Sequence, residues 1–512
     1  MLFAAGSLGA GSKVCVSCHA AIARSYAATP MALSSGATGT GLFRERFTAA
    51  SVSLTGGGSL DVALKNGHVE YAFREGDLKG RRSLDYFLGA GLVGRSYATA
   101  IEGFLFQAPV SYYSAPQKWA LSPGYERNPQ INLIREVEPA CLKCHATGVQ
   151  TIAGTTNGYA AEPFQEGGIG CEGCHGAGDE HVRIMKGGKA SGARSIVNPA
   201  KLPGGQRDSV CAQCHLPGAV EIARAGKHAG YKPGGLLSDS VVVFVLAGVD
   251  REATVNGHAE QLSRSACARQ SNGKLWCGSC HDAHRTVPVQ ERPAHYRKKC
   301  LQCHEEKSCK AAVGGDCTAC HMPKQQAATV AHAALTQHSI AKKTVAQASL
   351  PANLELTPFE GFAGSDRDLG LAYATIAIRD NNRAWGLRAL ELLTKVPEDD
   401  TKAAAKLAQL YDRMGRDKQA CAIYERVHSL DPTPAVIVNL GACRAAEGKI
   451  EESIALWKSA LKLSPAMEAG RLNLAVAQFR GGDGEAAKST LREGLKFNPL
   501  STRILQMLRD IQ

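Results

Sequence analysis

Cys141-Leu-Lys-Cys144-His145 is the first of six closely spaced Cys-x-x-Cys-His pentapeptides, which end with Cys317-Thr-Ala-Cys320-His321. A seventh copy, Cys15-Val-Ser-Cys18-His19, stands apart near the start of the sequence. Chance would give on the order of 0.02 copies at this composition, so the repetition reflects one chemistry used many times. The motif cysteines and histidines are Cys15, Cys18, His19, Cys141, Cys144, His145, Cys171, Cys174, His175, Cys211, Cys214, His215, Cys277, Cys280, His281, Cys300, Cys303, His304, Cys317, Cys320 and His321.

This pentapeptide is typical of covalent c-type haem attachment. The two cysteine sulfurs bond to the haem vinyl groups, and the adjacent histidine ligates the iron from one side. Zinc ribbons use two Cys-x-x-Cys pairs for one metal without a histidine after each second cysteine, and thioredoxin-type motifs occur singly. The sequence therefore predicts seven covalent c-type haems.

Bound haems would alter the net charge of the protein and would supply part of its apolar core. The polypeptide carries a net charge of +12, but each ferric haem adds about −1 and each ferrous haem about −2. The loaded protein lies near neutrality, many Lys and Arg side chains are expected to pair with haem propionates, and no nucleic-acid-binding module is present. Aromatic residues make up only 6% of the chain. We therefore expect porphyrins to supply much of the core of the N-terminal two-thirds, which should not fold without haem.

Haem attachment of this type takes place outside the cytoplasmic membrane, which predicts a periplasmic or extracellular protein. The first 15 residues are too short and lack the basic region of a full signal peptide, so a processed or truncated start is expected. No apolar run reaches transmembrane length, and the longest, Val241–Gly248, suits a buried strand.

Residues between the first and second motifs have a different character. Period-two alternation on both sides of Asn66-Gly67 predicts a β-hairpin. Further β-like runs are Ser83–Leu88, Ser96–Phe106 and Pro109–Tyr113, which together predict a small antiparallel β insert. Only a dozen residues separate His304 from Cys317, so the last haems must lie close together, as electron transfer requires.

The C-terminal part shows a repeat. Pro432, Pro465 and Pro499 recur at steps of 33 and 34 residues, and so do three glycines, Gly415, Gly448 and Gly482. This period is typical of tetratricopeptide repeats, with about four units and a final capping helix. The predicted fold is mainly α: a haem-packed multihaem cytochrome domain with a small antiparallel β insert, followed by an α-solenoid. The expected segments are a first haem segment (1–40), the β insert (41–135), a hexahaem run (136–340), a linker (341–365) and the repeats (366–512).

Nine histidines lie outside the motifs. His428 falls in a repeat helix and is expected to be structural, and His68 beside the hairpin turn is expected to be exposed. The others are candidate second ligands of the haem irons: His181, His228, His258, His284, His295, His332 and His338. His284 is too near His281 to reach the same iron, so it should ligate a neighbouring haem. Met31, a helix-length beyond His19, is either a sulfur ligand or a core methionine.

Candidate second ligands roughly equal the haems in number, which favours closed, six-coordinate irons and leaves one open iron as an alternative. Four cysteines lie outside the motifs. In an oxidising compartment, Cys267 and Cys309 are expected to form a disulfide, and Cys421 and Cys443, on successive repeat helices, are a second candidate pair.

The segment from Cys171 through His175-Gly-Ala-Gly-Asp-Glu to His181 resembles the cytochrome c554/c-prime family of multihaem cytochromes. In that family the trailing histidine is a distal iron ligand, which the resemblance implies for His181. Other segments resemble multihaem cytochromes fused to tetratricopeptide repeats. They are His258-Ala-Glu-Gln-Leu, Ser265-Ala-Cys267, Cys280-His281-Asp-Ala-His284, Cys320-His321-Met-Pro, His332 with His338, and the insert from Leu88 to Tyr125. The chain departs from those relatives at Met31, where many have a histidine.

The sequence therefore predicts an exported heptahaem cytochrome that relays electrons, with a repeat domain that docks redox partner proteins. One alternative is an oxidoreductase acting on a small nitrogen or sulfur compound at one open haem. Another is a subunit of an extracellular filament, in which haems continue from one copy of the chain to the next.

Overall fold

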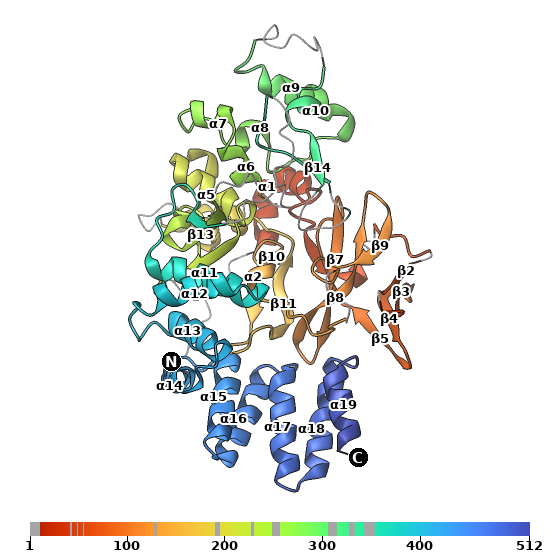
Figure 1. Cartoon of the computed structure of the whole chain (residues 1–512). Coiled ribbons are helices and arrows are strands. Elements are labelled where there is room, and N and C mark those ends of the chain that lie inside the picture. Colours follow the sequence, from red (N-terminus) through yellow and green to blue (C-terminus); the bar gives the residue numbers. More distant parts are fainter. Residues whose placement is uncertain are drawn as a thin grey trace.

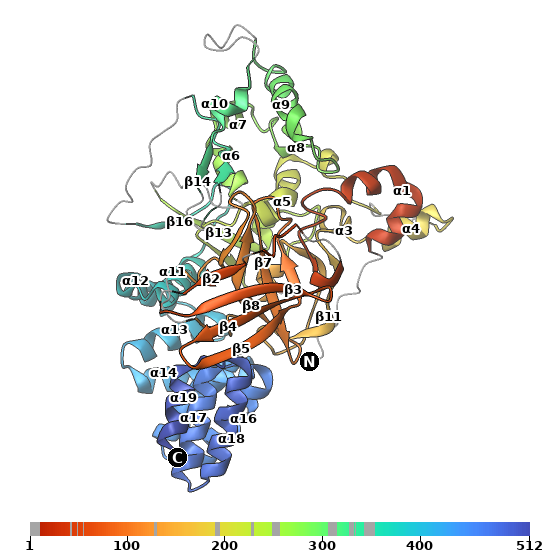
Figure 2. The same cartoon turned by 90° about the vertical axis from the view of Figure 1, so that its right-hand side faces the viewer.

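A computed structural model describes residues 11–40, 44–48, 50–54, 56–126, 131–189, 195–226, 230–247, 257–305, 315–326, 332, 334–342 and 354–511. Figure 1 shows three parts: a body of antiparallel sheets, a set of short helices that carry the motifs, and a solenoid of longer helices. Helices α9 (Arg292–Cys300) and α10 (Cys317–His321) lie at the end of the molecule farthest from the solenoid (Figures 1 and 2).

The body consists of two antiparallel sheets. The first has the order β2-β3-β4-β5 and the second β1-β6-β7-β8-β9. The predicted hairpin is present, with Asn66 and Gly67 at φ 50° and 80° between β3 and β4. The strands are β1 (Ser35–Ala37), β2 (Ser51–Ser53), β3 (Ser59–Lys65), β4 (His68–Glu75), β5 (Leu78–Leu84), β6 (Tyr86–Leu88), β7 (Gly94–Ile101), β8 (Phe104–Tyr113) and β9 (Lys118–Leu121).

Three sequence expectations need correction here. The N-terminal region is richer in antiparallel sheet than a mainly α fold with a small insert, and the run Ser96–Phe106 is divided between β7 and β8 by a turn at Glu102-Gly103. The sheets also enclose a core of protein side chains, including the fully buried Leu60 and Val110. Alternating burial along β4 explains this core, because every second side chain faces inward. Porphyrins are therefore not needed to fill this part of the molecule.

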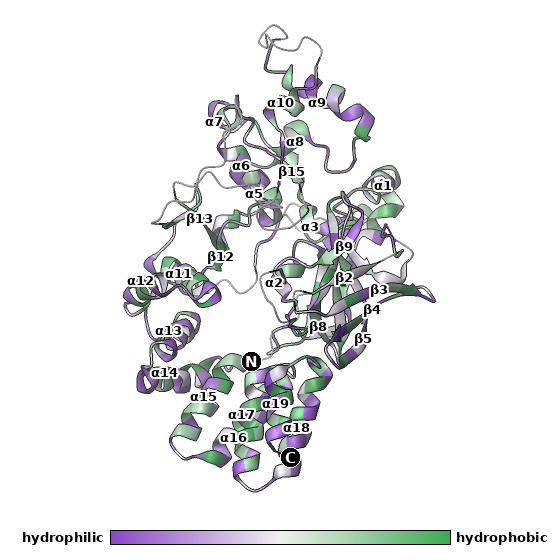
Figure 3. Ribbon diagram, turned by 45° about the vertical axis from the view of Figure 1, so that its right-hand side comes forward, coloured by the Kyte–Doolittle hydropathy of each residue, from purple (hydrophilic) through white to green (hydrophobic). Residues whose placement is uncertain are grey.

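Three smaller sheets lie among the motifs and extend the β content further. The apolar run that begins at Val241 forms β13, whose first four residues are buried, as the sequence predicts. Figure 3 shows this strand as hydrophobic throughout. The small sheets are β10 (Ala146–Thr151) with β11 (Tyr159–Gly167), β12 (Val220–Ala223) with β13 (Val241–Leu246) and β16 (Leu356–Pro358), and β14 (Lys324–Gln326) with β15 (Ala334–Thr336).

Apart from α1 and α5, the described helices that precede the solenoid have at most nine residues, and most helices in this part have no buried residue. This holds for α1, α3, α4, α7, α8, α9 and α10. Their bounds are α1 (Ser12–Tyr26), α2 (Pro139–Leu142), α3 (Glu172–His175), α4 (Asp179–Met185), α5 (Gly204–His215), α6 (His258–Ser263), α7 (Ala266–Gln270), α8 (Cys277–Cys280), α9 (Arg292–Cys300) and α10 (Cys317–His321). Single 3₁₀ turns are η1 (Thr38–Thr40), η2 (Pro199–Lys201), η3 (Leu237–Asp239) and η4 (Val289–Glu291).

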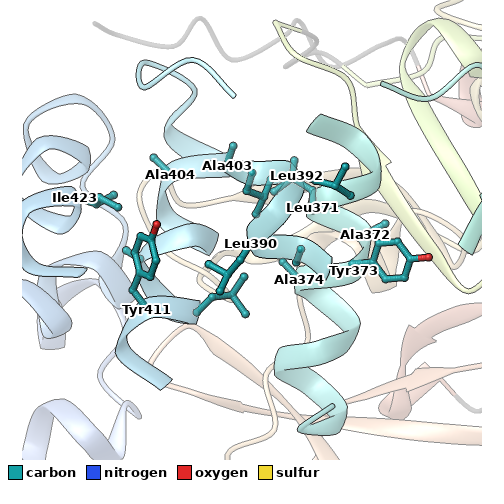
Figure 4. Close-up of a cluster of buried hydrophobic side chains, with 14 of the residues drawn as sticks. Leu371, Ala372, Tyr373, Ala374, Leu390, Leu392, Ala403, Ala404, Tyr411 and Ile423 are labelled. Carbon is teal, nitrogen blue, oxygen red and sulfur yellow. The ribbon is translucent and has the colours of Figure 1, made fainter. Parts of the chain in front are cut away.

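The predicted solenoid is confirmed. Gly415, Gly448 and Gly482 adopt φ of 69°, 79° and 87° at the turns within successive helix pairs, a conformation that glycine enters without strain. Figure 4 shows Leu390 of α12 and Tyr411 of α13 packed in the shared core. The helices are α11 (Asp366–Asp380), α12 (Arg383–Leu393), α13 (Thr401–Arg413), α14 (Asp417–Leu430), α15 (Pro434–Ala446), α16 (Ile450–Leu463), α17 (Glu468–Arg480), α18 (Gly484–Phe497) and α19 (Thr502–Asp510).

The solenoid packs against its own chain at both ends. Its first helices share a core with β12, β13 and β16. Near the C-terminus, Phe497 packs on Phe104 and Phe106 of β8, and the Arg82 guanidinium of β5 donates hydrogen bonds to the carbonyls of Lys496 and Phe497. Figure 2 shows the last helices directly below β4 and β5. Part of the repeat surface is therefore occupied within the molecule.

Candidate haem-binding region

All seven motifs lie in described residues, on or beside short helices. Those at Cys15, Cys171, Cys277 and Cys317 sit in α1, α3, α8 and α10, and the others begin near the ends of α2, α5 and α9. A short helical turn is the conformation that presents both cysteines of the motif on one side. Among the described residues, none of the fourteen motif cysteines takes part in a disulfide.

Cysteines of different motifs lie side by side in the structure, several of them far apart in the sequence. The thiol of Cys15 lies beside that of Cys171, and the thiol of Cys144 lies beside that of Cys214. Two further contacts join Cys211 to Cys277 and Cys300 to Cys317. The first motif therefore lies beside the third, the second beside the fourth, the fourth beside the fifth and the sixth beside the seventh. Groups attached at these cysteines would be near neighbours, and their order in space differs from their order in sequence.

Three motif histidines face a histidine from outside the motifs. The ring centres of His19 and His181 are 6.5 Å apart, with planes inclined by 20°. The other two pairs are His175 with His284, at 6.0 Å and 16°, and His281 with His338, at 6.2 Å and 32°. An iron between two imidazoles separates the ring centres by roughly 6 Å, because each metal–nitrogen bond is about 2 Å long and each nitrogen is about 1 Å from its ring centre. These pairs have the spacing that a two-histidine iron site requires.

A tighter group surrounds His258. Its ring centre is 5.1 Å from that of His215 and 4.5 Å from that of His338. The Nδ1 atoms of His215 and His258 are 3.0 Å apart, so one of them donates a hydrogen bond to the other. Among the described histidines outside the motifs, His258 is the one whose ring contacts His215 of the fourth motif.

Backbone carbonyls orient several of these imidazoles. A hydrogen bond from Nδ1 to a carbonyl fixes the ring and leaves Nε2 to bind a metal, a common arrangement at metal-binding histidines. Neither carbonyl acceptors nor their positions can be read from a sequence. The Nδ1 partners are the carbonyls of Ser34 for His145 (3.2 Å), Val197 for His175 (2.7 Å), Ala341 for His321 (3.0 Å) and Thr336 for His338 (3.0 Å), and the hydroxyls of Ser195 for His181 (3.4 Å) and Tyr296 for His281 (3.3 Å).

Burial also sets the protonation state. Desolvation lowers the pKa of His258 to about 3 and that of His281 to about 4, with further lowering by neighbouring histidines. Burial lowers the pKa of His145, His215 and His338 in the same direction. Neutral imidazole is the form that ligates a metal, so these side chains are ready to bind iron at neutral pH.

The remaining candidates are less clearly placed. The Nε2 atom of His295 on α9 is buried and has no hydrogen-bond partner among the described residues, which is an environment that suits a metal ligand. His332 lies edge-on to the ring of Tyr113 at 5.3 Å. Met31 is half-buried in the turn after α1, and its carbonyl accepts a hydrogen bond from the Ile169 amide. His68 is exposed, as expected, and His228 lies outside the described residues.

Tyr26 was not identified from the sequence. Its hydroxyl donates a 2.6 Å hydrogen bond to the carbonyl of Ile169, and its ring meets that of His284 edge-on at 6.2 Å. Burial raises its pKa. Tyr26 therefore ties α1, which carries the first motif, to the segment that leads into the third.

The cysteines outside the motifs give two results. Cys421 of α14 and Cys443 of α15 form a disulfide with Cα atoms 5.6 Å apart, as the sequence suggested. Cys309 lies outside the described residues, so its bond to Cys267 remains a prediction.

Comparisons with known proteins agree with this division of the chain. The family model described as cytochrome c554 and c-prime matches residues 114–176, and tetratricopeptide repeat models match residues 405–433 and 444–511. No curated protein gives a significant match. In the described residues no helix is both long enough and apolar enough to cross a membrane.

Several solved structures are similar to part of this chain. The MamA protein is 15% identical with a TM-score of 0.26, over 29% of this chain and 82% of its own length. The type III secretion translocator chaperone SycD of Yersinia enterocolitica is 21% identical with a TM-score of 0.21, over 24% of this chain and 91% of its own. The chain thus carries a cytochrome c554-like domain, of a family that binds c-type haem covalently, followed by C-terminal tetratricopeptide repeats, which indicates an electron-transfer protein with a domain for protein interaction.

Proposed function

We propose that this chain is an exported heptahaem c-type cytochrome that passes electrons along closely packed haems. The observation that carries the proposal is the set of thiol contacts between motifs, which joins the first to the third, the second to the fourth, the fourth to the fifth and the sixth to the seventh. Electron tunnelling falls steeply with distance, so a fold that brings attachment sites together favours transfer between them. The haems supply reversible one-electron chemistry when bound.

The chain's own residues hold and tune these groups. The motif cysteines attach the haems, and the motif histidines bind the irons from one side. We assign His181, His284 and His338 as second ligands opposite His19, His175 and His281, because each pair has the spacing of two imidazoles on one iron. His258 is the candidate second ligand for the fourth motif. The carbonyls bonded to Nδ1 keep these rings oriented and make them stronger ligands.

Two further features belong to this proposal. The Cys421–Cys443 disulfide is consistent with export, because disulfides persist in oxidising compartments. The repeat domain has free surface beyond its contacts with the sheets, including an open groove of about 360 Å³ between α12, α13 and α14 lined by residues such as Leu407 and Ile423. We assign the free repeat surface to protein redox partners.

One observation favours a second function. Within the described residues, no other histidine ring lies beside His145, His304 or His321. An iron held by one of these without a second ligand could act on a small nitrogen or sulfur compound. The same irons could instead receive a histidine from another copy of the chain, as in a filament.

The test uses the secreted protein and two histidine variants. Intact-mass measurement should find seven added haems, and the ferric spectrum should be dominated by low-spin iron. His181→Ala should convert one haem to high-spin, seen by electron paramagnetic resonance, while His68→Ala on the exposed hairpin should change nothing. Fewer than seven haems would refute the proposal. A high-spin signal in the unmodified protein that shifts with cyanide would favour the enzyme, and polymers in negative stain would favour the filament.

A further inference from the structure

Helix α1, which carries the first motif, is fastened at both ends to the segment that precedes the third motif. At its start, the Ser12 amide donates a hydrogen bond to the Glu166 carboxylate, and the Ser12 hydroxyl accepts one from the Cys171 amide at 2.9 Å. At its end, the Tyr26 hydroxyl donates a 2.6 Å hydrogen bond to the carbonyl of Ile169. The Tyr26 side chain is half-buried, and its hydroxyl is therefore held two residues before the attachment site at Cys171.

The turn that follows the fifth motif holds His284 only loosely. The His284 side chain is 44% exposed, and its Nδ1 atom is 3.6 Å from the Asp282 carboxylate. The backbone amide of His284 also donates a 2.9 Å hydrogen bond to Asp282, whose side chain is 59% exposed. Contacts between exposed polar groups contribute little because water competes for them. The turn alone therefore does not fix the orientation of this imidazole.

Two rings from other segments lie against His284 in the described part of the chain. His175 faces it at 6.0 Å with planes inclined by 16°, and the Nδ1 atom of His175 is 2.7 Å from the carbonyl of Val197. Tyr26 meets His284 edge-on, with ring centres 6.2 Å apart and planes inclined by 65°. Edge-to-face pairs at this separation are favourable. Because the Tyr26 hydroxyl is anchored to Ile169, the Tyr26 ring is a fixed surface against which the His284 ring packs.

We propose that Tyr26 is a positioning residue for the haem attached at Cys171 and Cys174, and that its ring holds His284 in place as the second iron ligand opposite His175. This inference rests on the proposed function, since it requires a haem at that site with two histidine ligands. One side chain then links three parts of the haem run, because α1 carries the first motif, Ile169 precedes the third and His284 follows the fifth. The orientation of one iron ligand thus depends on a helix that carries a different haem.

The positioning role determines how easily His284 leaves the iron. Carbon monoxide binds the reduced haem only in the fraction of molecules whose second ligand has left, so its apparent affinity rises with that fraction. Tyr26→Leu keeps a bulky side chain but removes the ring. It should reduce the half-saturating concentration of carbon monoxide for this haem about fivefold, the factor that one aromatic pair contributes. Tyr26→Phe keeps the ring and removes only the anchor to Ile169, and should reduce the same concentration about twofold.

The experiment is a carbon monoxide titration of the full-length, haem-loaded, reduced protein, followed by visible absorption. His284→Ala identifies the affected haem, because it should open that iron completely. Tyr26→Leu combined with His284→Ala should open no haem beyond the one opened by His284→Ala alone. Tyr86→Leu is the matched control and should leave the titration unchanged. Tyr86 is also half-buried and edge-on to a ring, that of Phe164 at 5.5 Å, and among the described residues it contacts no histidine ring.

Three outcomes would overturn the inference. In the first, Tyr26→Leu carries seven haems and titrates like the unmodified protein. In the second, Tyr86→Leu produces the same change as Tyr26→Leu, and in the third, the double variant opens a further haem. If Tyr26→Leu did not fold, an unchanged titration of Tyr26→Phe would overturn it.

One more variant separates this inference from the proposed function. Cys171→Ala with Cys174→Ala should reduce the intact mass by one haem. If the mass did not change, no haem is attached there and the proposed function fails. If the mass falls but His284→Ala opens no haem, the assignment of His284 as a ligand fails, and the inference fails with it. If the mass falls and His284→Ala opens one haem, while the Tyr26 variants titrate like the unmodified protein, only the inference about Tyr26 fails.

Discussion

The motif helices and the repeat helices belong to one chain, yet they are held in different ways. Every repeat helix from α11 to α19 has at least one buried side chain, and α13 has five. Helices α8, α9 and α10 have none. Isolated helices of this length are marginal in water, so the motif helices need another partner to pack against. Under the proposed function the haems would be that partner, and this role would be limited to the motif segments, because the sheets have their own core.

The largest expected effect comes from removing the haems. Replacing all fourteen motif cysteines by alanine should leave α11–α19 and the two large sheets folded, while α8–α10 lose most of their amide protection. Hydrogen exchange followed by mass spectrometry would measure this segment by segment. Equal protection of α8–α10 with and without haem would show that polypeptide contacts alone hold them.

A smaller effect is expected when a leucine is truncated in the core of the repeats and, for comparison, beside a motif helix. Leu491 of α18 is fully buried, so Leu491→Ala should reduce the free energy of unfolding by about 3 kcal/mol. Leu301, just after α9, is 37% exposed, and Leu301→Ala should change the free energy of unfolding by less than about 0.5 kcal/mol. Chemical denaturation followed by circular dichroism gives both values. Similar losses for the two variants would contradict the contrast between the regions.

The smallest expected effect concerns the contact between the sheets and the solenoid. Arg82→Ala removes the hydrogen bonds to the carbonyls at the end of α18 and should reduce stability by about 1–2 kcal/mol. Arg81→Ala is the control, because the neighbouring guanidinium is 63% exposed and pairs only weakly with Glu70. Limited proteolysis should cleave the chain between the sheets and the solenoid faster in Arg82→Ala than in the unmodified protein, and at an unchanged rate in Arg81→Ala. Unchanged cleavage would mean that apolar contacts such as Phe497 on Phe106 maintain the interface without Arg82.

Local sequence patterns were sufficient to predict structure where the interacting residues are close in sequence. The Asn66-Gly67 turn, the glycine and proline periods of the repeats and the strand at Val241 all follow from such patterns, and the structure has each of them. The extent of β structure was underestimated because several strands pair across long separations. Strand β16, within the expected linker, pairs with β13 more than 100 residues earlier, and three-residue strands of this kind have too little alternation to be recognised.

The sequence by itself determined the chemistry: seven attachment motifs, a set of spare histidines and a repeat domain. These follow from covalent spacing and local periodicity, which need no knowledge of the distant chain. Only the tertiary structure decided that the first motif lies beside the third, that His284 faces His175, and that Ser464 of the repeat domain bonds Glu136 shortly before the second motif. Such contacts depend on the packing of sheets and helices far apart in sequence, and many residue choices are compatible with each of them.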